Sequence, residues 1–497
     1  MVESPCSSAI PEAVVGSLKL AKIALVCLGV CTVGSAVSCS RSEASIDAEP
    51  TRIATKTAPD APDPYLDYPL YGLVSGAQFS VHKEPNPESL VVGWLRRGEV
   101  VRLKPAQLKT ATCRSGWFPL HPQGYACAGE GIDVSDKAPV ISDEDRVQAK
   151  RDAVMPYQYF LVKDGKAPEY HQLPSRDQQR AAVEYTSTWS KLEAEANAQK
   201  LKRFLEGTLP NQPKKHAVIR RFLERGFFVA ATGSTVRSSR RFVHTARGSF
   251  IKEQQLEPRN GATFQGVALD AKQGLPVVWA VREAVPQRAR IKDDGSVRFV
   301  DVPEAAPLAR LSRLTNWKGY TKIGDTLVHE LTDGTYLRHW FLAVAERMER
   351  PKEVKADEPW VHVDLSSQTL VLYVGDEPRY ATLVSSGLPD HETTPGSFRI
   401  QRKYVSDSMS DIGADAESDR YSIDDVPWTQ YFDGSRALHG AFWHAHFGIQ
   451  RSHGCVNLAP ADARYVFQHT EPFVPAGWHG MSTQKTGIRG SLVVITE

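Results

Sequence analysis

A cysteine and a histidine near the C-terminal end of the chain have the residue types that acyl transfer needs. Cys455 ends the sequence Ser-His-Gly-Cys at residues 452–455, and His439 lies shortly before it. A cysteine acyltransferase requires a thiolate, a base that forms the thiolate, and backbone N–H donors that bind the oxyanion. Because a free thiol titrates near pH ~8.5, a neighbouring imidazole is needed to raise the thiolate fraction. We therefore predict Cys455 as the nucleophile and His439 as its base.

Three residues are expected to build the loop around this thiol: Ser452, His453 and Gly454. Gly454 carries no side chain, so a substrate can approach the backbone there. The amide N–H groups near Cys455 are the candidate oxyanion donors. His453 fits a structural role in the loop as well as direct proton transfer, and the sequence leaves both roles open.

Zinc binding is an alternative for this segment, because the segment is dense in residues that can bind the metal. The candidate ligands are His439, His444, His446, His453 and Cys455. Their spacing argues against a zinc site, since no paired CxxC or HxxxH motif accompanies them. We therefore predict neither a metal nor another cofactor, and we interpret His444 as a hydrogen-bonded residue of the site wall.

Several motifs toward the C-terminal end resemble the catalytic domain of the L,D-transpeptidase (YkuD-type) family. They lie, in matching order, at residues 363–370, 382–387, 438–444, 447–448, 452–458, 461–463 and 492–495. The resemblance covers residues 356–497, and it is specific because separated motifs agree in order. It implies a catalytic domain that is mainly β. Alternating patterns typical of strands lie at residues 361–364, 369–373, 380–386 and 398–400.

The resemblance also implies roles for individual residues. Cys455 attacks, His439 takes up and later returns the proton, and the Gly440 carbonyl orients the imidazole. Residues 452–454 support the thiol and the oxyanion. Asn457 stands where many family members have arginine, and it is the expected substrate contact.

The substrate that the resemblance implies is a peptidoglycan stem peptide. The thiol attacks the carbonyl of an L-centre that precedes a D-residue, D-alanine leaves, and an amine resolves the thioester. An amine of a second stem gives a 3,3 cross-link, a protein lysine gives anchoring, and water gives L,D-carboxypeptidase activity. The sequence does not choose among these, and a non-catalytic peptidoglycan-binding envelope lipoprotein is the remaining alternative.

The N-terminal residues have the pattern of an export signal. Lys19 and Lys22 precede an apolar run at 23–37, which has the length of a signal-peptide core. The sequence Ala-Val-Ser-Cys that ends at Cys39 resembles a lipoprotein cleavage box, with simple signal cleavage as the alternative. We predict a signal peptide over residues 1–38, lipidation of Cys39 and a location in the periplasm or cell envelope. The expected partners are then a membrane, through the lipid anchor, and proteins of the envelope.

Cysteine usage agrees with an oxidising compartment. Of the seven cysteines, Cys113, Cys127 and Cys455 lie beyond the predicted targeting region. Cys113 and Cys127 flank a turn-rich segment, so a hairpin can bring them into bonding range. We predict a disulfide between them, and two reduced core thiols are the alternative.

Length and composition indicate several domains. The chain has 497 residues, of which 41% are hydrophobic, and a formal net charge of +2, which is too balanced to indicate a nucleic-acid partner. Residues 39–69 read as a flexible linker. Residues 70–135 contain short strand patterns separated by turns and resemble a bacterial SH3-like barrel. Residues 136–350 form a mixed middle region.

The middle region contains one helical pattern and a weak internal similarity. Ser175 and Gln178 form a predicted capping box before an apolar stripe that continues to Ala196 and ends before Gly207. Residues 242–252 resemble residues 327–338, which suggests a duplication of degenerate SH3-like units. In this alignment His244 matches His329, and both are expected to face solvent.

An acidic stretch at residues 403–428 interrupts the strand patterns of the catalytic domain. Its acidic residues are Asp407, Asp411, Asp415, Glu417, Asp419, Asp424 and Asp425. We interpret the stretch as an irregular lid over the thiol. Its carboxylates either attract the ammonium group of the acceptor or belong to a solvated loop.

Overall fold

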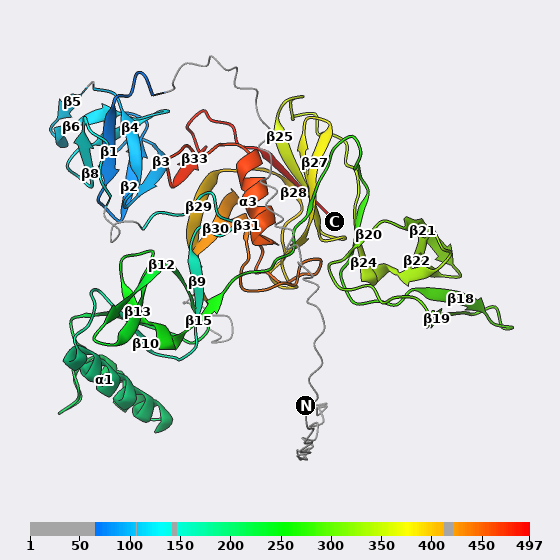
Figure 1. The fold of residues 1–497 in the computed structure, drawn as a ribbon, viewed down its shortest axis with the longest axis horizontal. Coiled ribbons are helices and arrows are strands. Elements are labelled where there is room, and N and C mark those ends of the chain that lie inside the picture. The colour runs from blue at the N-terminus through cyan, green and yellow to red at the C-terminus, as the bar shows by residue number, and fades with distance from the viewer. Residues whose placement is uncertain (1–64, 106, 142–146, 412–420) are drawn as a thin grey trace, which may run out of the picture. The chain divides into compact units, whose positions relative to one another are not determined.

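The computed structural model of the chain describes residues 65–105, 107–141, 147–411 and 421–497 (Figure 1). All of them belong to one compact unit, Ala58–Glu497, and they are mainly β. The predicted signal peptide, Cys39 and most of the predicted linker lie outside the described residues. No helix within the described ranges is long and apolar enough to cross a membrane.

Short strands form the first module, and their order agrees with the predicted pattern of strands and turns. They are β1 (Leu70–Val74), β2 (Gln78–His82), β3 (Val91–Arg96), β4 (Val100–Leu103), β5 (Leu108–Thr110), β6 (Cys113–Pro119), β7 (Tyr125–Cys127) and β8 (Ile132–Ser135). β1 lies between β4 and β8, while β2 pairs with β3 and β7. Alternate residues, among them Val81, Leu95 and Leu103, are fully buried and form its core.

The predicted disulfide is present in this module. Cys113 and Cys127 are bonded across the neighbouring strands β6 and β7, with their Cα atoms 5.9 Å apart. Both cysteines and Trp117 are buried in one small cluster. Cys455 is therefore the free cysteine of the described residues.

The middle region contains two β segments, one with a helical insertion. The first consists of β9 (Gln158–Val162), β10 (Ala167–Tyr170), α1 (Arg176–Ala194), α2 (Ala198–Leu205), β11 (Ile219–Leu223), β12 (Phe228–Arg237), β13 (Arg240–Thr245), β14 (Phe250–Lys252), η1 (Glu253–Gln255) and β15 (Leu256–Arg259). The second consists of β17 (Val277–Ala280), β18 (Gln287–Ile291), β19 (Val297–Asp301), β20 (Arg313–Leu314), β21 (Trp317–Ile323), β22 (Thr326–Leu331), β23 (Tyr336–Arg338), η2 (His339–Phe341) and β24 (Leu342–Ala345).

The two segments share strand order and register, as a duplication requires, and the duplication itself stays a prediction. In the first, β12, β13 and β14 pair in succession, the 3-10 turn η1 follows, and β15 pairs with β9. In the second, β21, β22, β23, η2 and β24 repeat this order, with β17 in place of β9. Phe242 pairs with Lys252, and Val328 pairs equivalently with Arg338. The SH3-like assignment of these units stays a prediction.

The shared register corrects the expected position of His329. It aligns His329 with Val243, one residue away from the sequence match to His244. His329 is fully buried, and its Nδ1 atom accepts the Nε1–H of Trp317 at 3.0 Å. The prediction that His329 faces solvent is wrong, because a shift of one residue moves a strand side chain to the opposite face. His244 is half-buried.

The helical pattern begins as predicted and ends earlier. The Ser175 and Gln178 capping box is present, with the Gln178 N–H donating to Ser175 Oγ at 3.2 Å. α1 ends at Ala194 because Ala196 has a φ of 52°, and α2 then begins after Asn197, whose side chain caps it. The expected continuous stripe through Ala196 is therefore wrong at that residue.

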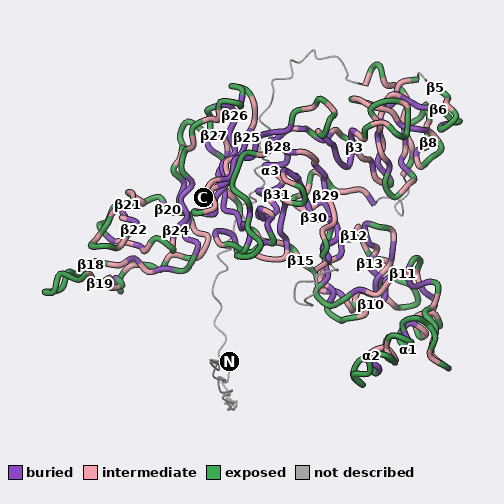
Figure 2. The backbone as a smooth tube through the Cα atoms, turned by 180° about the vertical axis from the view of Figure 1, so that it is seen from behind, coloured by how far each residue is buried: buried purple, intermediate pink, exposed green. Residues whose placement is uncertain are grey.

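The C-terminal domain is a β structure with one covering helix. It consists of β25 (Pro359–Asp364), β26 (Thr369–Val374), β27 (Glu377–Ser385), β28 (Gly396–Arg399), β29 (Arg402–Ser410), β30 (Ser422–Asp433), β31 (Arg436–Gly440), β32 (Val456–Leu458), α3 (Pro460–His469), β33 (Gly480–Ser482) and β34 (Leu492–Thr496). β16 (Val267–Ala268) joins its sheet by pairing with β27. α3 packs on β30 and β31. Figure 2 shows buried backbone along these strands and exposed backbone along α1 and β18.

The described parts of the acidic stretch, on either side of residues 412–420, are strands and not the irregular segment that the sequence suggested. Residues on both sides of 412–420 belong to β29 and β30, which form a long antiparallel hairpin. Asp424 and Asp425 are buried in β30, and Asp407 accepts the hydroxyl of Tyr431 at 2.9 Å. Asp415, Glu417 and Asp419 lie outside the described residues. Asp424 and Asp425 are therefore not exposed groups for an acceptor ammonium, because arginines from other segments pair with them.

Asp425 joins three parts of the chain. Arg96 of β3 forms an ion pair with its carboxylate, and Tyr159 of β9 donates to its carbonyl at 2.7 Å. Burial by itself would raise the pKa of Asp425, but Arg96 and more distant cations hold the pKa below its usual value. β3 also pairs directly with β33, through Gly93 and Met481. The first module is thus attached to the C-terminal domain by a strand pairing and a buried charge pair.

Replacing Arg96 with alanine should lower the free energy of unfolding by about 3–5 kcal/mol, because the substitution leaves a buried carboxylate unpaired. Urea unfolding at neutral pH measures this loss. The control is Arg259→Ala, which removes the half-exposed partner of Glu257 and should cost about 1 kcal/mol or less. Equal effects of the two substitutions would contradict a structural role for the Arg96 and Asp425 pair.

Candidate active site

Two neighbouring parallel strands bring the predicted nucleophile and base together. His439 lies on β31, and Cys455 immediately precedes β32; in the register of these strands Leu438 pairs with Val456 and His439 with Asn457. Cys455 is thus next to Ala437, and His439 lies two residues further along β31. The two residues are therefore diagonal neighbours on one face of the sheet, because alternate residues of a strand point to the same face. Rotation of the two side chains can close the gap between them.

His439 is a neutral base in this environment. Its side chain is buried, with 2% exposed, and its ring packs against Trp443 with centroids 5.7 Å apart. Burial lowers the pKa of His439 to about 4, although the Gly440 carbonyl opposes the shift. His439 Nδ1 lies 3.5 Å from Gly440 O, so the proton belongs on Nδ1 and Nε2 is left as the acceptor. The Gly440 contact is the one expected of an orienting carbonyl.

Cys455 is held as a thiol rather than a thiolate. Burial raises its pKa, while the Ala437 amide and the Arg436 charge oppose this. Its Sγ atom donates to Ser435 O at 3.7 Å, and the side chain packs against a cluster containing Tyr404 and Tyr431. No hydrogen bond joins the described atoms of Cys455 and His439. The resting pair is therefore neutral, and proton transfer to His439 must accompany attack on a substrate.

Hydrogen bonds fix the loop that carries the thiol. Ser452 Oγ accepts the Gly454 N–H at 3.1 Å and donates to the Cys455 carbonyl. Gly454 has a φ of 104°, a conformation that residues with a side chain rarely adopt. Its carbonyl accepts the Thr393 hydroxyl at 3.0 Å, which ties the loop to the segment after β27. Ser452, Gly454 and Thr393 thus hold the loop by hydrogen bonds, and their part in the chemistry stays a prediction.

Comparison with known proteins assigns this region to a family. Residues 358–495 match the family profile of YkuD, the L,D-transpeptidase catalytic domain. Residues 358–495 are a YkuD domain. The family assignment made from the sequence motifs is thus confirmed, while the SH3-like assignment of residues 70–135 stays a prediction. No curated protein matched the chain.

Solved structures similar to the chain include three L,D-transpeptidases. An Enterococcus faecium L,D-transpeptidase mutant is 19% identical over 29% of this chain and 50% of that chain, with a TM-score of 0.22. One from Stackebrandtia nassauensis is 21% identical over 29% and 58%, with a TM-score of 0.20. L,D-transpeptidase 3 from Mycobacterium tuberculosis is 13% identical over 54% and 94%, with a TM-score of 0.23. The chain thus spans half the length of the first of these structures.

Asn457 of the YkuD domain is buried and hydrogen-bonded to His444. The side-chain amide lies 2.9 Å from His444 Nε2. Burial lowers the pKa of His444 to about 3, and its Nδ1 atom accepts the His446 N–H at 3.1 Å. The neutral ring therefore carries its proton on Nε2, which requires the amide oxygen of Asn457 to face it. His444 is a hydrogen-bonded wall residue, as predicted, and substrate contact by Asn457 stays a prediction.

His453 of the YkuD domain, which the sequence placed in the loop around the thiol, lies among aromatic rings. His453 is exposed and lies between the rings of His391 and Tyr421, at centroid distances of 4.6 and 5.6 Å. These contacts favour a role in the loop rather than in proton transfer. The described residues contain no group of three or more histidine, cysteine or acidic side chains placed to hold a metal ion.

Several neighbours of the thiol in the YkuD domain were not identified from the sequence. Arg436 lies beside the loop, where its Nε is 3.4 Å from the position of a Cβ at Gly454, and it pairs with Asp433 at 2.7 Å. Its position three residues before His439 could have indicated from the sequence that Arg436 lies near the thiol. Tyr404 and Tyr431 carried no such signal, because their approach to Cys455 depends on the register of the β29 and β30 hairpin.

Proposed function

We propose that the chain is an exported L,D-transpeptidase that forms a thioester between Cys455 and a peptidoglycan stem peptide and transfers the acyl group to an amine. The observation that carries the proposal is the free Cys455 thiol of a YkuD domain, placed beside the strand that bears a buried, neutral His439. A nucleophile and base of this kind suit acyl transfer without a metal.

In the first step, the Cys455 sulfur attacks the carbonyl carbon of the L-centre while His439 Nε2 takes the thiol proton. The C–S bond forms, the carbonyl oxygen becomes an oxyanion, and amide N–H groups of the 452–455 loop are the proposed donors to it. The oxyanion then collapses and the C–N bond breaks. His439 gives its proton to the departing amine of D-alanine, which leaves the thioester on Cys455.

In the second step, an amine attacks the thioester and His439 takes a proton from it. The new C–N bond forms, the C–S bond breaks, and the sulfur recovers the proton from His439. Both steps use the same base in opposite directions, which suits the neutral pair of the resting site. Export through the predicted N-terminal signal, with lipidation at Cys39, would place this chemistry in the periplasm or cell envelope and attach the enzyme to a membrane.

The proposed reaction is tested with a synthetic tetrapeptide that ends in an L-centre and D-alanine, incubated with the purified chain and a diaminopimelate-type amine. Mass spectrometry should find the cross-linked peptide and an equal amount of free D-alanine. Release of D-alanine without an amine product would identify a carboxypeptidase instead. Absence of D-alanine release at any pH between 5 and 9 would rule out both activities.

A further inference from the structure

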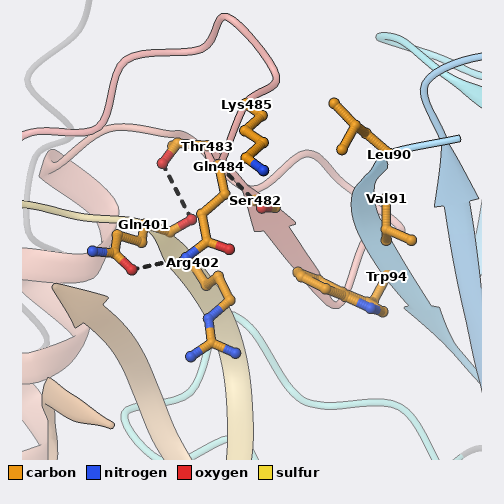
Figure 3. Close-up of a pocket in the computed structure, with 9 residues that line it drawn as sticks. All are labelled: Leu90, Val91, Trp94, Gln401, Arg402, Ser482, Thr483, Gln484 and Lys485. Carbon is orange, nitrogen blue, oxygen red and sulfur yellow. Dashed lines mark hydrogen bonds between the residues drawn. The ribbon is translucent and has the colours of Figure 1, made fainter. Parts of the chain in front are cut away.

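A groove of about 760 Å³ separates the first module from the YkuD domain (Figure 3). On one side, Leu90, Val91 and Trp94 present an apolar wall, which comes from β3 and the residue before it. On the other side, Arg402 of β29 and Lys485 after β33 present a polar and cationic wall. The pairing of β3 with β33 holds the two walls together. The groove is therefore built into the fold by segments that are far apart in sequence.

The charge of the groove is entirely positive. Arg402 and Lys485 line it, and no acidic side chain does. The Arg402 guanidinium lies over the ring of Tyr431, 4.6 Å from its centroid, and Nη2 donates to Gly434 O at 3.2 Å. Arg402 Nε is buried and has no hydrogen-bond partner. Carboxylate oxygens are the preferred partners of a guanidinium and an ammonium group that line one groove.

The groove is next to the thiol. Arg402 bonds Gly434, and the adjacent residue Ser435 accepts the hydrogen bond of Cys455 Sγ. Trp94 packs on Tyr404 with ring centroids 4.8 Å apart, and both rings belong to the cluster that Cys455 contacts. Groove and thiol thus both adjoin the turn between β30 and β31. An extended peptide advances at most ~3.6 Å per residue, so a stem of a few residues can occupy both.

We propose that this groove binds the carboxylate-bearing part of an acidic peptide, and so positions the donor stem for attack by Cys455. A substrate carboxylate pairs with Lys485 and with the guanidinium of Arg402. Apolar side chains of the same peptide lie on Trp94 and Val91. The inference rests on the proposed function. It adds to that function the feature that determines which peptide the enzyme selects. A neutral sugar chain is less well matched, because it has no charge to complement the two cations.

Binding to the inactive Cys455→Ala chain tests the proposal without any chemical step. Calorimetry should show that a tetrapeptide with free side carboxylates binds roughly 10-fold more tightly than the same peptide with those carboxylates amidated, through charge-assisted hydrogen bonds. Lys485→Glu and Arg402→Gln in this background should each remove the preference. The matched control is Lys292→Glu, which reverses an exposed lysine of the second repeat and should leave binding unchanged.

Equal affinity for the acidic and amidated peptides would overturn the proposal, as would an unchanged preference in Lys485→Glu. Tighter binding of an uncharged disaccharide than of the acidic peptide would also overturn it, in favour of a glycan site. Circular dichroism checks that Arg402→Gln is folded. If Arg402→Gln does not fold, Lys485→Glu still tests the proposal, because Lys485 is exposed. Formation of the thioester by the unmodified chain tests the proposed function separately.

Discussion

Replacement of Cys455 by alanine is expected to lower the rate of acyl transfer by about 10,000-fold or more, because the substitution removes the atom that forms the covalent intermediate. No described residue can take its place, since Cys113 and Cys127 are bonded to each other. Release of D-alanine from the tetrapeptide donor measures the effect.

The variant must keep its fold for this result to bear on chemistry. Cys455 is half-buried at the edge of an aromatic cluster, so the loss of one sulfur atom should shift the melting temperature only slightly. The Cys113→Ala and Cys127→Ala double variant serves as the control for general cysteine loss, and it should retain activity at temperatures where it is folded. Activity above about one per cent in Cys455→Ala would show that another group is the nucleophile.

Replacement of His439 by glutamine should lower the rate roughly 100- to 10,000-fold, because the thiol loses the base that takes its proton. The pH profile gives a sharper expectation. Burial lowers the pKa of His439 to about 4, so the imidazole is a proton acceptor above that pH and a charged non-acceptor below it. The rate of the unmodified chain should therefore fall as the pH drops through about 4, and not near the usual histidine value of about 6.5.

The glutamine variant should lack this fall in rate at low pH. Its residual alkylation by iodoacetamide should instead rise with pH as the thiol ionises, above the usual cysteine range because burial raises the pKa of Cys455. His446→Gln is the matched control, since His446 is an exposed histidine of the same segment. A low-pH fall of the same shape in His439→Gln, or one centred near 6.5 in the unmodified chain, would remove His439 from the role of base.

The site could be predicted from sequence where its parts are close along the chain. Cys455, His439 and the Gly440 carbonyl belong to one short segment, and the β31 and β32 register carries them to neighbouring positions. His439 is buried because Trp443 and the core pack around it, and this burial sets its pKa. No sequence motif indicated that burial. Motif spacing therefore singled out the candidate groups, while the fold determines their protonation.

The predictions that failed depended on contacts between distant segments. Asp424 and Asp425 looked like exposed acids, yet Arg96, Arg221 and Arg247 from other parts of the chain neutralise them inside the fold. A sequence window around the acids contains none of these partners. The groove at Trp94 also depends on contacts between distant segments, because the pairing of β3 with β33 places Trp94 beside the YkuD domain.

The most direct test of the central claim is mass spectrometry of the purified chain after exposure to a carbapenem, whose strained carbonyl offers Cys455 an acyl group that it cannot readily release. We predict one adduct with the mass of the added carbapenem, located by peptide mapping at Cys455 and absent from Cys455→Ala. An unmodified chain, or an adduct that persists in Cys455→Ala, would contradict the claim that this sulfur is the nucleophile.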